Sequence, residues 1–536
     1  MRQVNFLSGY AIAPNPSICA FLRNRETGDR AIARFCKVRQ KRSMKSIDDE
    51  SSDILPTEPT SKNSLLKNGF WATYGAFATR FLALANNLLL ARLLLPSEFG
   101  VIGVAYIFWS FVNLFAQDTA ASFIVYKGIK DKRYLNTTYT ISLGIGLILA
   151  VGLIATSPLI AKFFGIPDLI WLLTGFAFNL VLSFYQSVYV GVLRSQMRFQ
   201  SLTNLTLVAS MARVFSTVVS ALLGLSYWSF LIGDMISWVI ASILARREVK
   251  YNFQLQIDKE VCSEVLSYSL GGTGYSLGYY VNANSDNFVV GKLLGTTSLG
   301  YYNLAYQLTM ALPVILSQVV NQIGMSAFTQ MTDDKQQENA LKNVIEQIAV
   351  FITPIYALFF LIIDKQAISL IFGEKWTPVA ALIPWLLVFA YFRVVNSAIS
   401  SMLQAKGRPG VNAKVNLIIA PIAVIGFVIG SIQGKIIGVS ISVAIILGIG
   451  WTFYWWSVGC KALKWSMIKI LQPSFLPIFF TVILMICFSY LPIIIKPIIF
   501  AIAYLIVMRR FQPIYFRKIQ DFADKGFLLI RRKINL

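Results

Sequence analysis

The chain has 536 residues, of which 56% are hydrophobic and 14% are charged, and its mean hydropathy is +0.63. Soluble domains carry about 25% charged residues, so this composition excludes a string of soluble domains. The formal net charge is +23. In a membrane protein such a charge reflects lysines and arginines in cytoplasmic connections, so we expect no nucleic-acid partner.

Residues 1–64 are predicted to form a cytoplasmic leader without stable structure. A basic cluster occupies residues 34–45, and an acidic stretch rich in Pro, Ser and Thr follows up to residue 62. Such segments bury too little apolar surface to fold on their own.

Beyond the leader, long apolar stretches recur along the chain, and each is long enough to be a membrane-spanning helix. The alternation typical of a β-barrel is absent, so the sequence predicts an all-α polytopic membrane protein. We expect about fourteen spans, at 70–90, 101–124, 138–157, 169–193, 202–223, 227–245, 265–290, 299–325, 345–363, 379–403, 412–431, 436–456, 473–490 and 493–508.

The distribution of Lys and Arg supports this number. The connections after even-numbered spans hold 18 of them and those after odd-numbered spans hold 7, whereas the leader holds 12 and the tail holds 8. The positive-inside rule then places both termini and all even-numbered connections in the cytoplasm.

One segment occurs twice in the chain. Residues 83–106 (ALANNLLLARLLLPSEFGVIGVAY) and 283–306 (ANSDNFVVGKLLGTTSLGYYNLAY) align without a gap at an offset of 200 residues. Ala83, Asn87, Gly100 and Tyr106 recur, and Arg92 becomes Lys292. The spans that carry the two copies run in the same direction, so we predict a parallel repeat of two six-helix bundles, a pattern known from transporters.

The predicted organisation follows from the repeat. It comprises an N-terminal bundle at 65–250, a C-terminal bundle at 251–460, two further helices within 461–510 and a basic cytoplasmic tail at 511–536.

The second copy resembles the signature of the polysaccharide transporter family, in the multidrug/oligosaccharidyl-lipid/polysaccharide exporter superfamily. The stretches ARLLLPSEFG (91–100), FGEKW (372–376) and QAKGRP (404–409) look similar as well. The Wzx-type flippases are the members that it resembles most. The resemblance implies export of an undecaprenyl-diphosphate-linked oligosaccharide across the bacterial plasma membrane, for exopolysaccharide, lipopolysaccharide or capsule synthesis. It also implies a polysaccharide polymerase and a chain-length regulator as partners, besides membrane lipid.

Three arginines are predicted to lie deep inside spans: Arg80, Arg213 and Arg393. A central arginine costs at least about 2.5–3.5 kcal/mol to insert, so such residues face a wet cavity or pair with an acid. Polar side chains at helical spacing extend the candidate substrate-binding set, which also contains Asn87, Asn113, Gln117, Asn282 and Gln318. The alternative is that these amides are hydrogen-bonded contacts between helices.

Three acids are candidates for coupling transport to Na⁺ or H⁺: Asp286, Asp118 and Asp234. Asp286 ranks first because it lies in the repeat, where its counterpart is Asn86. Asp286 and Asp118 lie near predicted span ends, where water would hydrate them easily. Pairing with an arginine is the alternative role.

Catalytic chemistry finds little support in the sequence. There is no histidine, the five cysteines are far apart, and no nucleotide-binding motif or sugar-cleaving acid pair is evident. We therefore expect a protein that is not an enzyme, with no resident metal or cofactor. A multidrug extruder of the same superfamily is the main alternative, although central arginines favour an anionic substrate. A membrane polysaccharide polymerase is a further alternative, and it would need a large extracytoplasmic loop that is absent here. A scaffold without transport activity is the last alternative, and the free-energy cost of placing charges at helix centres argues against it.

Overall fold

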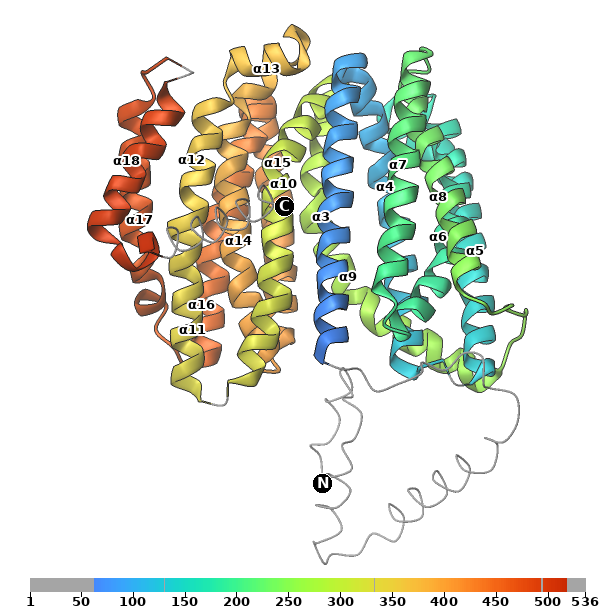
Figure 1. The fold of residues 1–536 in the computed structure, drawn as a ribbon. Coiled ribbons are helices and arrows are strands. Elements are labelled where there is room, and N and C mark those ends of the chain that lie inside the picture. Colours follow the sequence, from blue (N-terminus) through green and yellow to red (C-terminus); the bar gives the residue numbers. More distant parts are fainter. Residues whose placement is uncertain (1–61, 130, 332, 493–494, 518–536) are drawn as a thin grey trace, which may run out of the picture.

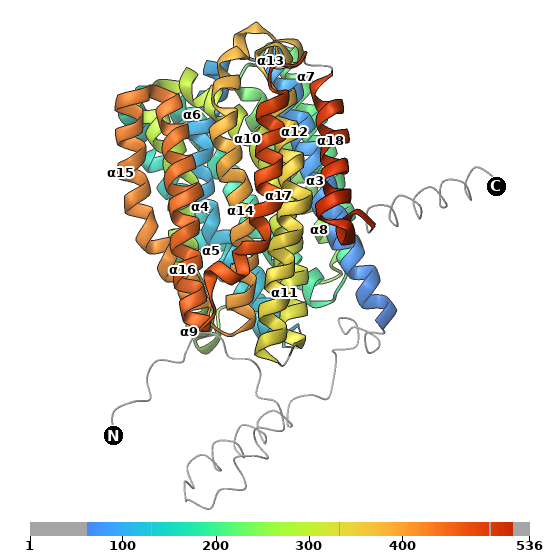
Figure 2. The same cartoon turned by 90° about the vertical axis from the view of Figure 1, so that its left-hand side faces the viewer.

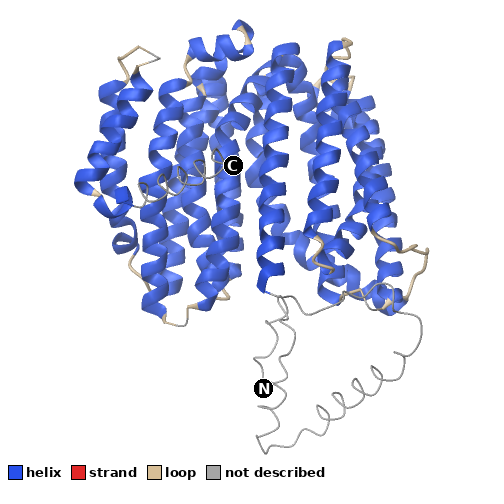
Figure 3. Cartoon of the chain, viewed as in Figure 1, coloured by secondary structure: helices blue, strands red, loops and turns tan. Residues whose placement is uncertain are grey.

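The computed structural model describes residues 62–129, 131–331, 333–492 and 495–517, and within these ranges it contains helices and no strands (Figure 3). Most of the predicted leader and most of the basic tail lie outside them, whereas residues 62–64 already belong to the first described helix. Nine helices of the described chain are long and apolar enough to cross a membrane. The all-α membrane fold is therefore confirmed.

The first bundle consists of six helices, on the right of Figure 1. They are α3 (Lys62–Leu93), α4 (Pro96–Lys127), α5 (Lys132–Phe164), α6 (Leu169–Ser195), α7 (Phe199–Leu222) and α8 (Trp228–Glu248). Local sequence sets their ends. Pro96 begins α4, where a missing N–H costs nothing, and Gly165 ends α5 at a φ of 70°, which glycine adopts without strain.

The second bundle lies mostly on the left of Figure 1, with α9 crossing behind α3 toward the first bundle. Its helices are α9 (Lys259–Leu293), α10 (Gly295–Gln330), α11 (Asp334–Gln347), α12 (Thr353–Ile362), α13 (Lys365–Phe372), α14 (Ile383–Ala405), α15 (Pro409–Ser442) and α16 (Trp451–Leu463). Single π-helical segments join α11 to α12 (Ile348–Ile352) and α15 to α16 (Val443–Gly450), and a 3₁₀ segment (Glu374–Ala381) precedes α14. The backbone of α15 breaks at Gly434 and Lys435.

Helices α17 (Met467–Phe488) and α18 (Lys496–Phe511) form an appendix to the second bundle. Figure 2 shows them beside α12, and α17 also contacts α11. A small apolar cluster that includes Leu361, Phe500 and Tyr504 holds them there. They therefore cover the outer side of the second bundle.

The predicted spans agree with these helices in position. Each of the fourteen overlaps a helix, and the boundary expected between 431 and 436 coincides with the break at Gly434. Nine helices meet the length and hydropathy criteria, with the whole of Pro409–Leu463 taken as one, so the number fourteen stays a prediction. The sequence did not predict α13, an amphipathic helix of only eight residues.

The connection between the bundles is held in an extended form along α5. The backbone N–H groups of Gln254, Gln256 and Asp258 donate to the side chains of Asn136 (3.2 Å), Thr140 (3.0 Å) and Thr137 (3.2 Å). Alternate residues bond because the segment is extended, so that every second N–H faces the helix. The connection is thus fixed to the first bundle up to the start of α9.

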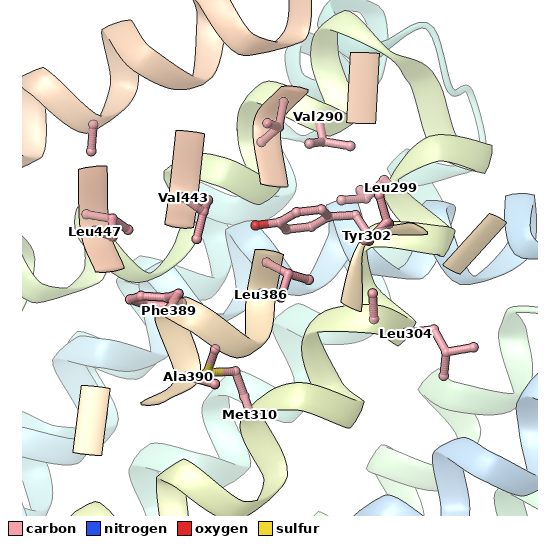
Figure 4. Packing of buried hydrophobic residues seen from close by; sticks show 14 of the residues in the cluster. Val290, Leu299, Tyr302, Leu304, Met310, Leu386, Phe389, Ala390, Val443 and Leu447 are labelled. Carbon is pink, nitrogen blue, oxygen red and sulfur yellow. The ribbon is translucent and has the colours of Figure 1, made fainter. Parts of the chain in front are cut away.

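The two bundles meet mainly through α4, which packs against both α9 and α10. Within the second bundle, an apolar core is enclosed by α9, α10, α14 and the π-helical segment Val443–Gly450 (Figure 4). Tyr302 of α10 lies among Val290, Leu386 and Val443 there, and its side chain is completely buried. Any polar group in this core needs a hydrogen-bond partner, which matters for the acid described next.

Candidate functional site

Arg213 of α7 forms an ion pair with Asp234 of α8. Tyr106 of α4 connects the two: its hydroxyl accepts from the Arg213 guanidinium (2.9 Å) and donates to the Asp234 carboxylate (2.6 Å). The Arg213 side chain is 29% exposed and that of Asp234 is 10% exposed. Of the two roles open to a deep arginine, the structure thus gives Arg213 the ion pair, and it gives Asp234 the same role.

Arg393 of α14 contacts the corresponding tyrosine of the second bundle. Its guanidinium donates to the Tyr306 hydroxyl at 3.4 Å, and Tyr306 is the repeat counterpart of Tyr106. The two arginines reach these tyrosines from helices that are not equivalent in the repeat: α7 corresponds to the fifth predicted span of the first bundle, and α14 corresponds to the fourth predicted span of the second. Arg393 is partly buried. The repeat thus places one tyrosine–arginine contact in each bundle.

Asp286 of α9 lies inside the second bundle. Its side chain accepts from the Tyr302 hydroxyl (2.7 Å) and from the backbone N–H of Asn287 (2.7 Å), and the residue is 1% exposed. The expectation that water would hydrate Asp286 easily is therefore wrong. The residue is seven positions from the end of α9, and there the helix is covered by α10 and not by solvent.

The first bundle carries a neutral version of this pair. Asn86 and Ile102 occupy the positions equivalent to Asp286 and Tyr302. Asn86 is also 1% exposed, and both polar atoms of its side chain lack a hydrogen-bond partner among the described residues. The same place in the fold thus accepts a neutral amide in one bundle and an acid in the other.

Arg80 lies near the middle of α3, the helix that stands between the two bundles in Figure 1. Its side chain is exposed, as are those of Tyr74, Phe77 and Phe81 along the same helix. The opposite side of α3 packs on α7, where Gly75 lies against Thr203. Asn87, about two turns beyond Arg80, is half-buried.

Two of the predicted substrate-binding amides hold helices together in this structure. Asn113 of α4 is 3% exposed and accepts from Ser183 of α6 (2.6 Å). Asn282 of α9 is 6% exposed and donates to the backbone carbonyl of Asn416 in α15 (2.9 Å). Both are thus contacts between helices, the alternative that the sequence left open.

Three predicted residues cannot be placed at this level of detail. The side chains of Gln117, Asp118 and Gln318 lie outside the described residues, so only their positions on α4 and α10 are defined. Their predicted roles stay predictions.

The tyrosines Tyr106, Tyr302 and Tyr306 were missed as site residues. Tyrosine inside a membrane helix is unremarkable by composition, since it packs as an apolar ring with one polar atom. Recurrence was the signal that could have found two of them, because Tyr106 and Tyr306 are identical at the offset of 200 residues. Among the described residues, no group of three or more Cys, Asp or Glu side chains is arranged to hold a metal ion.

Comparison with known proteins decides the family. Residues 89–381, more than half of the chain, match the family described as "Polysaccharide biosynthesis protein". The chain belongs to this family. The matched range begins in α3 and ends before α14. It contains residues 89–106 of the first copy of the repeated segment and the whole second copy. This is a family of membrane transporters and not of enzymes, and the resemblance seen in the repeat is confirmed.

Two curated relatives extend the match. The lipopolysaccharide biosynthesis protein WzxC of Escherichia coli is 22% identical over 371 residues, which cover 66% of this chain and 74% of WzxC. The teichuronic acid biosynthesis protein TuaB of Bacillus subtilis is 22% identical over 366 residues, covering 65% and 73%.

A solved structure shares the fold. The lipid II flippase MurJ in an inward closed conformation superposes with a TM-score of 0.68 at 16% identity, over 84% of this chain and 99% of MurJ.

Proposed function

We propose that this protein moves undecaprenyl-diphosphate-linked oligosaccharides from the cytoplasmic to the outer leaflet of the bacterial plasma membrane, by alternating access between its two bundles. Family membership and the biosynthetic pathways named for WzxC and TuaB support a polysaccharide precursor as the substrate. The fold shared with a lipid II flippase supports a mechanism for a large lipid-linked sugar. The charge pattern of the connections favours cytoplasmic termini.

Arg80 is the observation that carries this proposal. An arginine exposed at the middle of a membrane helix would cost at least about 2.5–3.5 kcal/mol if it faced lipid. The cost is avoided if the exposed side of α3 borders a water-filled space between the bundles. A guanidinium that borders such a space can bind a phosphate through two parallel hydrogen bonds.

A wet space between the bundles is also what the cargo demands. Burying one unpaired hydroxyl in hydrocarbon costs roughly 2–7 kcal/mol, so an oligosaccharide with about ten hydroxyls cannot cross through lipid. Its diphosphate requires cations on the way. We assign that role to Arg80 and Arg393, and a secondary one to Arg213, whose charge is already balanced by Asp234. Asn87, Gln117 and Gln318 would add polar surface for the sugar.

Asp286 is our candidate for coupling transport to a proton gradient. Its carboxyl group is buried and bonded to a tyrosine hydroxyl, and the equivalent position in the first bundle is a neutral asparagine. A protonated carboxyl resembles that amide in shape, so the fold has room for the neutral form. We rank Asp286 above Asp118, and above Asp234 because the latter is paired with Arg213. A polysaccharide polymerase and a chain-length regulator would be the partners that consume the product.

Purified protein in liposomes tests the proposal. A fluorescent polyprenyl-diphosphate oligosaccharide is incorporated on both leaflets, and an impermeant glycosidase outside reports how fast the inner pool becomes accessible. We expect rapid exposure with the wild type and strong loss with Arg80→Gln and Arg393→Gln. Lys250→Gln, an exposed cation in the connection between the bundles, is the matched control and should transport normally. An inner pool that stays protected with folded wild-type protein, over several sugars, would reject the function.

A further inference from the structure

Helices α4 and α10 touch backbone to backbone at the end of the protein where both begin. A Cβ atom added to Gly100 would overlap the carbonyl oxygen of Thr296, and one added to Gly300 would overlap that of Pro96. Residues 100 and 300 are equivalent in the repeat, and so are 96 and 296. The two contacts are therefore the same contact made twice, once in each direction.

The next turn shows where the axis of this symmetry passes. Gly103 faces Asn303, its own counterpart at the offset of 200 residues, and an added Cβ would overlap the amide nitrogen of Asn303. A residue meets its own equivalent only on or near a two-fold axis. The repeated segments thus form the interface between the bundles at this end.

A second reciprocal pair of contacts surrounds the crossing. Arg92, at the end of α3, donates to the backbone carbonyl of Leu370 near the end of α13 in the other bundle. Lys292, at the end of α9, donates to the carbonyl of Phe163 near the end of α5 and lies 4.0 Å from the centre of the Phe163 ring. The last carbonyls of a helix lack intrahelical partners and form its negative end, so a cation is well placed there.

The repeat accounts for this pair as well. Arg92 and Lys292 occupy equivalent positions, and the helices that accept from them both end at a Phe-Gly pair, Phe164-Gly165 and Phe372-Gly373. The two cations and the two residues whose carbonyls accept from them are exposed: Arg92, Lys292, Leu370 and Phe163. Water can therefore replace each hydrogen bond when the bundles move apart.

The segment FGEKW adds contacts on one side only. The Trp376 indole donates to the carbonyl of Ala91 (2.6 Å), and the Lys375 ammonium donates to the carbonyl of Arg92 (3.1 Å). The Trp376 ring is completely buried and lies edge-on to Phe99 of α4, with ring centres 5.2 Å apart. The motif thus closes the end of α3 from the opposite bundle.

We propose that the repeated segments are the outer gate of the transporter, with Arg92 and Lys292 as two equivalent latches that must open before cargo can leave. The glycines let α4 and α10 approach closely, and the latches bias the bundles toward this closed arrangement. The orientation rests on the charge pattern, which places this end outside, and the role in release rests on the proposed transport function. The gate itself can be tested without any substrate.

Spin-label distances report the gate directly. In protein without its five native cysteines, single cysteines at Leu223 and Ile432 place labels on exposed sites of the two bundles, at the end where α4 and α10 begin. We expect Arg92→Gln together with Lys292→Gln to raise the population with a long separation by about tenfold in nanodiscs. Each single variant should give an intermediate population, so the test survives if the double variant does not fold.

Two controls separate the latches from a general effect of charge. Lys162→Gln removes an exposed cation next to Phe163 and should leave the distances unchanged. Arg92→Lys together with Lys292→Arg keeps both donors and should restore the closed population. Unchanged distances in the double Gln variant, or an equal shift with Lys162→Gln, would overturn the gate. Distances that respond as expected, in a wild-type protein that moves no lipid-linked sugar in the liposome assay, would leave the gate standing and reject the transport function.

Discussion

The pair Arg213–Asp234 allows a prediction that separates structural from substrate-binding roles. Removing one partner of a buried ion pair costs about 3–5 kcal/mol, because the other charge is left without compensation. Asp234 is 10% exposed, so Arg213→Gln should destabilise the protein by about 3 kcal/mol. We expect the lower end of the range because Tyr106 still donates a hydrogen bond to the Asp234 carboxylate. Arg213 is 29% exposed and can be partly hydrated, so Asp234→Asn should cost only about 1–2 kcal/mol.

The double variant completes the cycle. Arg213→Gln with Asp234→Asn leaves no unpaired charge, so it should be more stable than Arg213→Gln alone, with a coupling free energy of about 1–3 kcal/mol. Unfolding of the purified protein in detergent, followed by intrinsic fluorescence, measures the three variants against the wild type. Arg133→Gln is the control, because the pair of Arg133 with Asp131 is 60% and 41% exposed and should contribute little.

Two results would refute this reasoning. The first is an Arg213→Gln protein as stable as the wild type, and the second is a double variant as unstable as the sum of the single ones. Transport by the double variant then decides the role of Arg213. Activity near that of the wild type would leave this arginine a structural role, whereas loss of transport in a stable double variant would show that its charge serves the cargo.

Three further predictions follow from other contacts. Gly100→Ala should destabilise the protein by about 1–3 kcal/mol in the same unfolding assay, because the added Cβ would overlap the backbone of Thr296. Gly152→Ala is the control and should not destabilise the protein, because there is open space around Gly152. Equal stabilities of the two variants would contradict the close approach of α4 and α10. Asp286→Asn should fold normally and lose the response of transport to an imposed pH gradient; a response that persists would reject this acid as the proton site. Asn136→Ala should speed tryptic cleavage after Lys250, because the connection loses its bonds to α5; a cleavage rate like that of the wild type would mean that these bonds do not hold it.

The helical architecture could be read from the sequence because the bilayer imposes it. Each apolar stretch has to satisfy its backbone hydrogen bonds within itself, so hydropathy alone shows where along the chain the helices lie. The boundary expected between residues 431 and 436 falls at the break at Gly434 and Lys435. The segment α13 was missed because it is too short to cross a membrane, and hydropathy carries little information about helices outside the lipid.

The site divides in the same way. The cost of a charge inside lipid singled out Arg80, Arg213, Arg393 and the three acids from the sequence. Which charges pair depends on how helices far apart in the chain are packed, and only the tertiary structure joins Arg213 to Asp234 through Tyr106. Burial is likewise a property of neighbouring helices, so the distance of Asp286 from its helix end did not predict that α10 covers it.

The repeat shows both sides of this division. The sequence alone determined that the chain has two equivalent halves, since seven identities at one fixed offset state it directly. It did not explain why the repeated segment lies where α3 joins α4 in one half and where α9 joins α10 in the other. Only the packed structure shows that Gly100 and Gly300 make the same contact in opposite directions. It also shows that Arg92 and Lys292 each donate to a carbonyl near the end of a helix in the opposite bundle. The physical reason is that an interface between two related halves uses the same surface twice, so both copies retain the residues that form it.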